Sequence, residues 1–431
     1  LFEATSYNLA MILTYCYKIK PTPKQVEKID HWLELLRRHW NYALGQRLDY
    51  ARQTRSSVDR CSLVSESIGE IPEPVNYYTQ QAALKETKIL FPDYKEIYSE
   101  VQQINLQRLD KAWKKWRVPD KNGKRGGRPR FKKAGQLRSF GFSRVNHPKA
   151  TIKFEGKNLI TTRLGIILVV VHRPIPEGFK LKTASIVKKA DGYYVCLSGK
   201  DERVPEPLHH DKIKSAVGID VGLKEFLTTS EGETVPIQQT YRQVQNHLAR
   251  QQRRLKNKKK GSQNYQKQQH KIAKIHQRIQ RQRKDFQYKI ATWLTRCYDL
   301  IAVEDLKILG LARTRLSKSV LDAAWGQFIT LLEAVAVKCG SLVVKVNPHG
   351  MSIDCSGCGT KVPKTLSVRT HECPKCSLVM DRDENAAINI LNRAIEELQA
   401  VGLIVSVCGG LGSSQPVKQE TSANWVQLSL F

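Results

Sequence analysis

Hydrophobic residues recur at three- and four-residue steps in two stretches near the start of the chain. In the first, which follows a Pro-Thr-Pro turn at 21–23, the repeating residues are Val26, Ile29, Leu33, Leu36 and Trp40. In the second, from about 79 to 117, they are Val101, Ile104, Leu109, Trp113 and Trp116. This spacing puts apolar side chains on one face of an α-helix. We therefore predict a short strand before the turn and then two helical stretches whose tryptophans pack in a core.

Between residues 136 and 200 the pattern changes to an alternation of apolar and polar positions. The segments ATIKFEGKNLITT and ASIVKKADGYYVCLSG each alternate about a glycine turn, which is typical of β-hairpins. The run GIILVVV at 165–171 predicts a buried strand, because it is β-branched and far shorter than the ~18–20 residues that cross a bilayer. Several short strands in succession predict a small barrel or curled sheet, and a Pro-containing linker at 204–208 ends this half.

Length and charge narrow the class of protein. The 431 residues exceed the ~250–300 at which a single core stops growing, so we expect two or more domains. Lys and Arg number 71 against 40 Asp and Glu, which gives a formal net charge of +31. An excess that is both large and clustered favours nucleic-acid binding over simple solubility. We expect no signal peptide and no membrane-spanning segment, hence a cytosolic protein without a membrane partner.

The first basic cluster is KNGKRGGRPRFKK at 121–133, which we interpret as a glycine-loosened loop. A solvated charge run is the usual explanation of such a segment. Here the arginine side chains suit phosphate, and Phe131 could stack or anchor. We favour nucleic-acid contact, and the candidate residues are Lys124, Arg125, Arg128, Arg130 and Lys132.

The second basic cluster lies on a predicted helical hairpin at 241–295 that breaks at Gly261-Ser262. A narrow apolar stripe faces a core and consists of Ile272, Ile275, Ile279, Phe286, Ile290 and Trp293. The concentration of charge before the break favours polyanion binding, where each neutralised phosphate adds ~0.7–0.9 to the salt slope. The candidate contacts are Arg253, Arg254, Lys256, Lys258, Lys259 and Lys260.

Three acidic segments follow one another along the second half. Asp220 ends the apolar strand of SAVGID, and Glu304 ends that of LIAVE. An acid in a strand buried on both faces requires a cationic partner, although a strand that simply ends in solvent explains either one alone. In DRDENAAINI, Asp383 or Asp381 precedes an apolar helix, where N-capping by Asp is the common alternative.

Taken together, two acids at strand ends and one at a helix start are what an RNase H-like nuclease requires. In such enzymes the acids converge on two magnesium ions ~4 Å apart, one activating water and the other stabilising the leaving oxygen. Magnesium prefers oxygen ligands, which explains the carboxylates. The sequence therefore predicts a magnesium-dependent endonuclease with Asp220, Glu304 and a third acid, either Asp381 or Asp383, as catalytic metal ligands.

Four of the ten cysteines form two Cys-x-x-Cys pairs, Cys355/Cys358 and Cys373/Cys376. This spacing predicts a closed, structural zinc site with four thiolates; replacement of one cysteine by His371 is the less favoured alternative. The other cysteines are expected to be ordinary thiols, namely Cys16, Cys61, Cys196, Cys297, Cys339 and Cys408.

The order of these motifs resembles the TnpB (OrfB) family of insertion-sequence-encoded, RNA-guided nucleases, which are related to type V CRISPR effectors. The segments that carry the resemblance are YKIKPTPKQ, GRPRFKK, GIDVGLKEF, the basic helix, VEDL, CSGC…CPKC and DRDENAAINI, spanning about 15 to 394. DRDxNAAxNI after a four-cysteine ribbon is highly specific, whereas PTPKQ alone is not. The chain departs from the family where CPKCSL has no Gly after the last cysteine.

The resemblance implies a multidomain α+β fold. An N-terminal wedge-type β-barrel at 11–208 would carry a helical recognition insert at about 24–118. An RNase H-like, RuvC-like α/β nuclease domain would follow at 209–347 and 380–400, interrupted by a zinc ribbon at 348–379. Residues 1–10 would be an extension of unclear origin and 401–431 a flexible tail.

The implied function is transposon-associated, RNA-guided cleavage of double-stranded DNA next to a short flanking motif. The guide would be an RNA transcribed from the element's end, and the protein would act in the prokaryotic cytoplasm at the nucleoid. The residues carried over are Asp220, Glu304 and Asp383, with Asp305 a neighbour and not a ligand. Two alternatives remain: a transposase that also joins strands, and an inactive RNA- and DNA-binding regulator.

Overall fold

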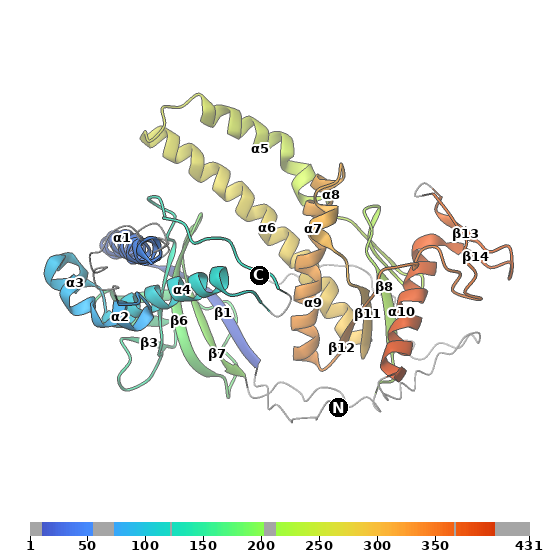
Figure 1. Cartoon of the computed structure of the whole chain (residues 1–431), viewed down its shortest axis with the longest axis horizontal. Coiled ribbons are helices and arrows are strands. Elements are labelled where there is room, and N and C mark those ends of the chain that lie inside the picture. Colours follow the sequence, from blue (N-terminus) through green and yellow to red (C-terminus); the bar gives the residue numbers. More distant parts are fainter. Residues whose placement is uncertain (1–10, 55–72, 121–122, 202–212, 366–367, 401–431) are drawn as a thin grey trace, which may run out of the picture. The chain divides into compact units, whose positions relative to one another are not determined.

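The computed structural model describes residues 11–54, 73–120, 123–201, 213–365 and 368–400. The predicted extension at 1–10, the linker at 204–208, Cys61, Cys408 and the tail at 401–431 lie outside these residues. The chain divides into two compact units between residues 202 and 203 (Figure 1). Each unit has a β-sheet with helices packed on it, so the fold is multidomain α+β.

The first unit contains a curled, seven-stranded antiparallel sheet (Figure 1). Its strands are β1 (Met11–Lys20), β2 (Ser139–Phe142), β3 (Ile152–Glu155), β4 (Asn158–Thr161), β5 (Gly165–Val170), β6 (Lys180–Lys189) and β7 (Gly192–Asp201). The hydrogen-bonded order is β2-β6-β7-β1-β5-β4-β3. In the described residues β2 and β3 are therefore the two edges, and closure into a barrel stays a prediction.

Side chains of β1 alternate between the core and the outer face, as the pleat of a strand requires. Tyr15, Tyr17 and Ile19 are buried against helix α1 (Pro23–Gln53) and the other strands. The prediction of a buried strand at 165–171 is correct for the strand and wrong for its burial. Ile166 and Leu168 of β5 are 62% and 47% exposed, because only alternate residues of this sheet face its core.

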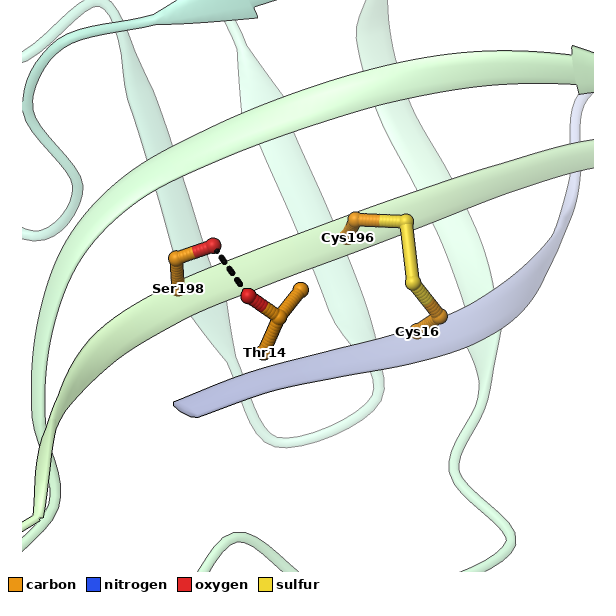
Figure 2. The surroundings of a disulfide bond; sticks show 4 residues. All are labelled: Thr14, Cys16, Cys196 and Ser198. Atoms are coloured by element: carbon orange, nitrogen blue, oxygen red, sulfur yellow. Dashed lines mark hydrogen bonds between the residues drawn. A yellow bond between two sulfur atoms is a disulfide. The ribbon is translucent and has the colours of Figure 1, made fainter. Parts of the chain in front are cut away.

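Cys16 of β1 and Cys196 of β7 form a disulfide, so the prediction of two ordinary thiols is wrong (Figure 2). The two residues are direct partners in the antiparallel register, next to the hydrogen-bonded pair Thr14 and Ser198. The disulfide could not be predicted from the sequence because 180 residues separate the two cysteines and only the register of the sheet brings their sulfurs together. Disulfides are rare in a reducing cytosol, so this bond is unusual for a protein of the predicted cytosolic compartment.

Helices of the first unit pack on one another and on the sheet. They are α1 (Pro23–Gln53), α2 (Tyr77–Ala82), α3 (Leu84–Leu90), the 3-10 helix η2 (Pro92–Glu96) and α4 (Ser99–Arg117). Thr22 and Gln25 form a capping box at the start of α1, which explains why the helix begins after the proline turn. The second predicted helical stretch is thus three short elements followed by the 19-residue α4. The chain is broken near Phe91-Pro92, where Pro92 cannot donate a backbone hydrogen bond.

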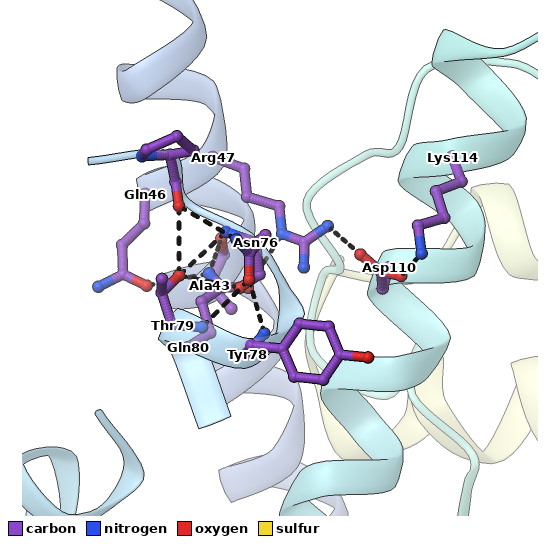
Figure 3. A network of polar contacts seen from close by, with 10 residues as sticks. Ala43, Gln46, Arg47, Asn76, Tyr78, Thr79, Gln80, Asp110 and Lys114 are labelled. Carbon is purple, nitrogen blue, oxygen red and sulfur yellow. Dashed lines mark hydrogen bonds and ion pairs between the residues drawn. The ribbon is translucent and has the colours of Figure 1, made fainter. Parts of the chain in front are cut away.

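A buried arginine joins three of these helices (Figure 3). Arg47 of α1 donates from Nε to Gln80 of α2 at 2.9 Å and pairs with Asp110 of α4 at 3.0 Å. Gln80 in turn donates to the Ala43 carbonyl at 2.8 Å. The guanidinium is 1% exposed, and a buried charge is tolerated only with such partners. The network therefore fixes α2 and α4 against α1.

His39 should make the first unit sensitive to mild acid. Burial, with a smaller contribution from Lys88, lowers the pKa of His39 to about 4, so the folded protein holds a neutral ring. The unfolded chain binds this proton near pH 6.5. Stability is thus complete above that pH and falls as the pH drops towards 4, by up to about 3 kcal/mol. Urea unfolding at pH 7 and pH 5 should show a larger loss for the wild type than for His39→Gln; equal losses would contradict this prediction.

The second unit contains a five-stranded sheet in the order β10-β9-β8-β11-β12. The strands are β8 (Ala216–Asp220), β9 (Glu225–Thr229), β10 (Thr234–Pro236), β11 (Leu300–Glu304) and β12 (Leu342–Val346). Strands β8, β11 and β12 are parallel, whereas β9 and β10 are antiparallel to their neighbours. A two-stranded ladder of β13 (Thr370–Glu372) and β14 (Val379–Asp381) follows.

Helices cover both faces of the five-stranded sheet. One face packs on α6 (Gln263–Cys297) and α9 (Trp325–Cys339), and the other packs on α10 (Arg382–Ala400). The basic hairpin consists of α5 (Thr240–Lys256) and α6, joined by a turn with Gly261 at φ +85°. The first turn of α5 is capped by buried Asp322 of α8 (Ser317–Ala323), which accepts from the Tyr241 N–H at 2.9 Å and pairs with Arg283 of α6. A further short helix is α7 (Ile308–Leu311).

One described segment, Ser317–Cys339, is long and apolar enough to cross a membrane by length and composition alone. In the structure it is two helices, α8 and α9, separated at Ala324 with φ +53°. Trp325, Phe328 and Leu332 are buried in the core of the second unit. The segment is therefore core structure, which is the reason for its apolar composition.

Candidate active site

The ends of two neighbouring parallel strands bring the first two predicted acids together. In the register of β8 and β11, Ile219 pairs with Val303, so Asp220 and Glu304 are the next residues on adjacent strands. Both side chains are partly buried. Because carboxyl ends of parallel strands meet at one edge of a sheet, this edge concentrates negative charge.

Asp383 reaches the same place from the first turn of α10. Its charge, together with that of Glu304, acts on Asp220, whereas Asp381 is exposed and accepts from the Asp383 N–H at 2.8 Å. Asp381 thus caps the helix, as the alternative interpretation expected for this segment. Asp305, the predicted neighbour, is exposed and donates its N–H to the Val346 carbonyl.

Burial makes this group of acids costly in its ionised form. Burial first, and then the charges of Glu304 and Asp383, raise the pKa of Asp220 to about 8. Burial raises the pKa of Glu304 to about 7, although the charge of Arg393 opposes the shift. Carboxylates with raised pKa values at the end of a sheet are typical of functional sites, and a cation would relieve their repulsion.

Two arginines hold Asp383. Arg369, next to β13, donates to one carboxylate oxygen at 2.9 Å, and Arg382 donates to the other at 2.8 Å. Arg382 also donates its backbone N–H to the Arg369 carbonyl at 2.6 Å. The small ladder that precedes α10 therefore fixes the position of the third acid.

The four predicted cysteines form one cluster. The Sγ atoms of Cys355, Cys358, Cys373 and Cys376 all lie within 4.8 Å of one another, and no histidine belongs to the group. Two of the separations, Cys355–Cys376 and Cys358–Cys373, are 3.5 Å. His371 instead contacts Lys364. Hydrogen bonds between Cys358 and the side chain and backbone of Thr360 lower the pKa of Cys358 to about 6, which favours the thiolate that metal binding requires. The cluster could hold a metal ion.

Comparison with known proteins now identifies the family. Family models match three parts of the chain: "Probable transposase" at 201–315, "Cas12f1-like, TNB domain" at 325–390 and "Helix-turn-helix domain" at 11–56. A protein of Streptomyces pristinaespiralis named "Putative RNA-guided DNA endonuclease" is 30% identical over 404 residues, which is 91% of this chain and 90% of that protein. The chain belongs to the TnpB (OrfB) family.

Two further relatives agree with the assignment to TnpB. "Putative RNA-guided DNA endonuclease InsQ" of Escherichia coli K12 is 29% identical over 345 residues, covering 76% of this chain and 80% of its own. A cryo-EM structure of a Cas12f1–sgRNA–target DNA complex matches with a TM-score of 0.50 and 12% identity, over 89% of this chain and 99% of that chain. The latter similarity shows the fold alone.

The part of the helix-turn-helix match that the structure describes in this TnpB-family chain is a strand followed by a helix. Within residues 11–54 the structure has the strand β1 and the single helix α1.

Most of the candidate nucleic-acid contacts are exposed. In the first cluster Lys124, Arg125, Arg128 and Arg130 face solvent, while Lys132 is half-buried with its Nζ 4.2 Å from the Trp40 ring centroid. The second cluster lies at the end of α5 and in the turn to α6. There Arg253, Arg254, Lys256, Lys259 and Lys260 are exposed and Lys258 is half-buried. Their role stays a prediction.

Sequence reasoning missed the residues that dock α10. Gly218 of β8 lies so close to α10 that an added Cβ would be 2.0 Å from the Ala387 carbonyl oxygen. Asn385 accepts from the Ser356 N–H and donates to the Asp354 carbonyl, to which Asn389 also donates. The signal was present in NAAIN: two asparagines four residues apart in an apolar helix share one face. They attach the cysteine cluster to α10.

Ser377, which follows the last cysteine, has a backbone conformation that favours glycine. Its φ is +58°, in the left-handed region where glycine carries no steric penalty. Ser377→Gly should therefore stabilise the cluster by roughly 0.5–1 kcal/mol. In competition with a metal chelator, the affinity of the cluster for a metal ion should increase about 2- to 5-fold. Lys375→Gly, at a residue whose φ is negative, should show no increase. An equal response of the two variants would contradict the backbone explanation.

Proposed function

We propose that this TnpB-family protein is a transposon-associated, RNA-guided endonuclease that hydrolyses phosphodiester bonds of DNA next to a short flanking motif. The observation that carries the proposal is the convergence of Asp220, Glu304 and Asp383 at one end of a mixed sheet. The endonuclease names of the full-length relatives support it. Cleavage would leave 5′-phosphate and 3′-hydroxyl ends.

The donor set fits magnesium. Three carboxylates offer the hard oxygen ligands that Mg²⁺ prefers, and a pair of ions would activate water and stabilise the leaving oxygen. Asp220, Glu304 and Asp383 would hold them. The sheet order, with one antiparallel strand pair beside three parallel strands, supports an RNase H-like, RuvC-like domain. We keep the proposed bounds of 209–347 and 380–400 for it, with the ribbon at 348–379 and the wedge-type barrel at 11–208.

The chain's own residues prepare this site in defined ways. With pKa values of about 8 and 7, Asp220 and Glu304 retain protons near neutral pH and release them when a cation binds. Arg393 of α10 donates to the carbonyls of Asn347 and His349, so its charge stays near Glu304. Arg369 and Arg382 orient the Asp383 carboxylate through two ion pairs. Asp383 would give up one of these ion pairs on binding a cation.

The four cysteines fit zinc. Tetrahedral Zn²⁺ with Zn–S bonds of ~2.3 Å places its sulfurs about 3.8 Å apart. This is close to the 3.5 Å that separates the sulfurs of Cys355 and Cys376 and those of Cys358 and Cys373. Such a closed site does no chemistry and instead folds a segment that has little core. We propose that it also positions Asp383, which Cys373→Ser would test: normal magnesium-dependent cleavage by that variant would refute this role.

The proposed partners are a guide RNA from the element's end and a double-stranded DNA target, in the prokaryotic cytoplasm at the nucleoid. Base pairing would supply sequence specificity, while protein contacts read duplex shape and the flanking motif. The net charge of +31 and the two exposed basic clusters support polyanion binding.

The experiment that tests the proposal is sequencing of the RNA that copurifies with the protein when both are expressed from the native locus. We expect one discrete species with a constant scaffold and a 3′ segment that matches DNA beyond the element. Copurification of bulk RNA, or of no RNA, would contradict the proposal that an RNA guides the protein.

The "Probable transposase" model at 201–315 favours one rival, a transposase that joins strands as well as cutting them. Carboxylate transposases use similar metals. Incubation of the purified protein with labelled element ends and a target plasmid would decide, since only the rival yields covalently joined products.

A further inference from the structure

The basic strap, which we define as residues 124–133, is hydrogen-bonded to its neighbours near both ends. At its start the Lys124 N–H donates to Asp120 at 2.8 Å, and the Gly126 N–H donates to the Lys115 carbonyl of α4 at 2.7 Å. An added Cβ at Gly126 would lie 2.7 Å from Lys115 Cγ. Glycine therefore serves close packing against α4 at this position, not looseness.

Helix α1 holds the other end of the strap through three side chains. Asn41 accepts from the Lys132 N–H at 2.8 Å and donates to the Lys132 carbonyl at 3.0 Å. Arg37 donates to the same carbonyl at 2.9 Å, and Trp40 donates from Nε1 to the Arg130 carbonyl at 3.3 Å. The residues on both sides of Phe131 are thus held in place.

The side chains of Lys132 and Arg128 contact aromatic rings of the same unit, whereas the ring of Phe131 is largely exposed. Lys132 lies over the Trp40 ring, and the Arg128 guanidinium lies 5.8 Å from the Trp116 ring centroid. Phe131, in contrast, leaves 55% of its side chain exposed. The aromatic ring therefore does not anchor the strap, although the sequence allowed that role. The Phe131 ring is therefore accessible to a ligand.

The electrostatic setting selects an anionic ligand. No Asp or Glu occurs between Asp120 and Glu155, while Arg130 and Lys133, on either side of Phe131, are both exposed. An exposed ring among cations matches single-stranded nucleic-acid sites, where bases stack on aromatics and the backbone follows positive charge.

We propose that Phe131 is a stacking site for one unpaired nucleobase, with Arg130 and Lys133 binding the adjoining phosphates. The inference deepens the proposed function and rests on it only for the presence of a nucleic-acid partner. The hydrogen bonds to Arg130 and Lys132 matter because a binding site whose backbone is already ordered loses little conformational entropy on binding. Stacking discriminates weakly between bases, so the site would hold a position of the strand and not read its sequence.

The test compares oligonucleotides with and without bases. Full-length protein would be titrated with a uridine RNA, a thymidine DNA and an abasic strand, each of about 12 nucleotides. The wild type should bind the base-bearing strands more tightly than the abasic one. Phe131→Leu should reduce that ratio by roughly 5- to 150-fold, the range for loss of a stacking aromatic, while abasic affinity and its salt dependence stay unchanged.

Matched variants make the outcome specific. Phe91→Leu is the control, since Phe91 belongs to the same unit and is 47% exposed but packs on Tyr42 and Tyr94. It should leave the ratio unchanged, and Phe131→Tyr should preserve it. If Phe131→Leu lowers the ratio of RNA to abasic affinity, or that of DNA to abasic affinity, the result supports the proposal and identifies which kind of strand stacks on Phe131.

An unchanged ratio in Phe131→Leu, or an equal fall in Phe91→Leu, would overturn the stacking site. Neither guide RNA nor cleavage enters this measurement. An unchanged ratio in a protein that still cleaves under guidance would therefore remove only the stacking site, and a reduced ratio in a protein without nuclease activity would remove only the proposed function.

Discussion

Replacing Asp220 with asparagine should abolish DNA cleavage and at the same time stabilise the metal-free protein. Cleavage should fall by roughly 10³-fold or more, because the neutral amide cannot supply the charge that holds a catalytic cation. Stability should rise because the folded pKa of about 8 lies well above the ordinary value of 3.8. A carboxyl with a raised pKa loses stability as the pH increases between these values, by up to about 4 kcal/mol at pH 7.

The combination of effects separates a catalytic acid from a structural one. Guide binding should be retained by Asp220→Asn, and thermal unfolding without divalent metal should occur at higher temperature than in the wild type. Asp305→Asn is the matched control, since Asp305 is exposed at the same strand end and should change neither property. Unchanged cleavage in Asp220→Asn would instead support the inactive regulator.

Gly218→Ala should detach α10 from the sheet. An added Cβ would lie 2.0 Å from the Ala387 carbonyl oxygen and 2.9 Å from the Leu391 backbone nitrogen, and neither backbone atom can yield without moving the helix. Overpacking of this kind costs about 1–3 kcal/mol or more. Since α10 carries Asp383, cleavage should fall with stability, and magnesium should protect the variant less than the wild type against thermal unfolding.

Gly310→Ala provides the control for this substitution. Gly310 lies in the same unit, in α7, and an added Cβ there would meet nothing within 4 Å. It should leave cleavage unchanged and stability equal or slightly higher, because alanine favours helix. Similar losses in the two variants would contradict the close approach of α10 to β8.

Local patterns predicted the elements and the four-cysteine cluster. Cys-x-x-Cys spacing is a short-range signal, and metal-ligand geometry leaves few alternatives for two such pairs. Asp220 and Glu304 could be proposed from the sequence because each ends an apolar run, and the register of β8 and β11 places them on adjacent strands. Periodicity also identified the basic hairpin, whose turn residues Gly261 and Ser262 have a left-handed φ and a helix-capping side chain respectively.

Features that depend on pairing between distant segments could not be predicted. The Cys16–Cys196 disulfide and the exposure of Ile166 both follow from the strand order of the first sheet. The choice between Asp381 and Asp383 depends on how α10 meets β8, which Gly218 determines from 165 residues earlier in the chain. Such contacts are set by tertiary packing, on which local spacing carries no information.

The central claim is that an RNA directs this nuclease, and reprogramming the guide tests it most directly. The protein would be purified with its RNA, the 3′ segment would be exchanged for an unrelated sequence, and plasmids carrying each matching site beside randomised flanks would be cut and sequenced. The account predicts that cleavage moves to the new site, requires one flanking motif and disappears in Asp220→Asn. Cleavage that stays at the original sequence whatever the guide would contradict it.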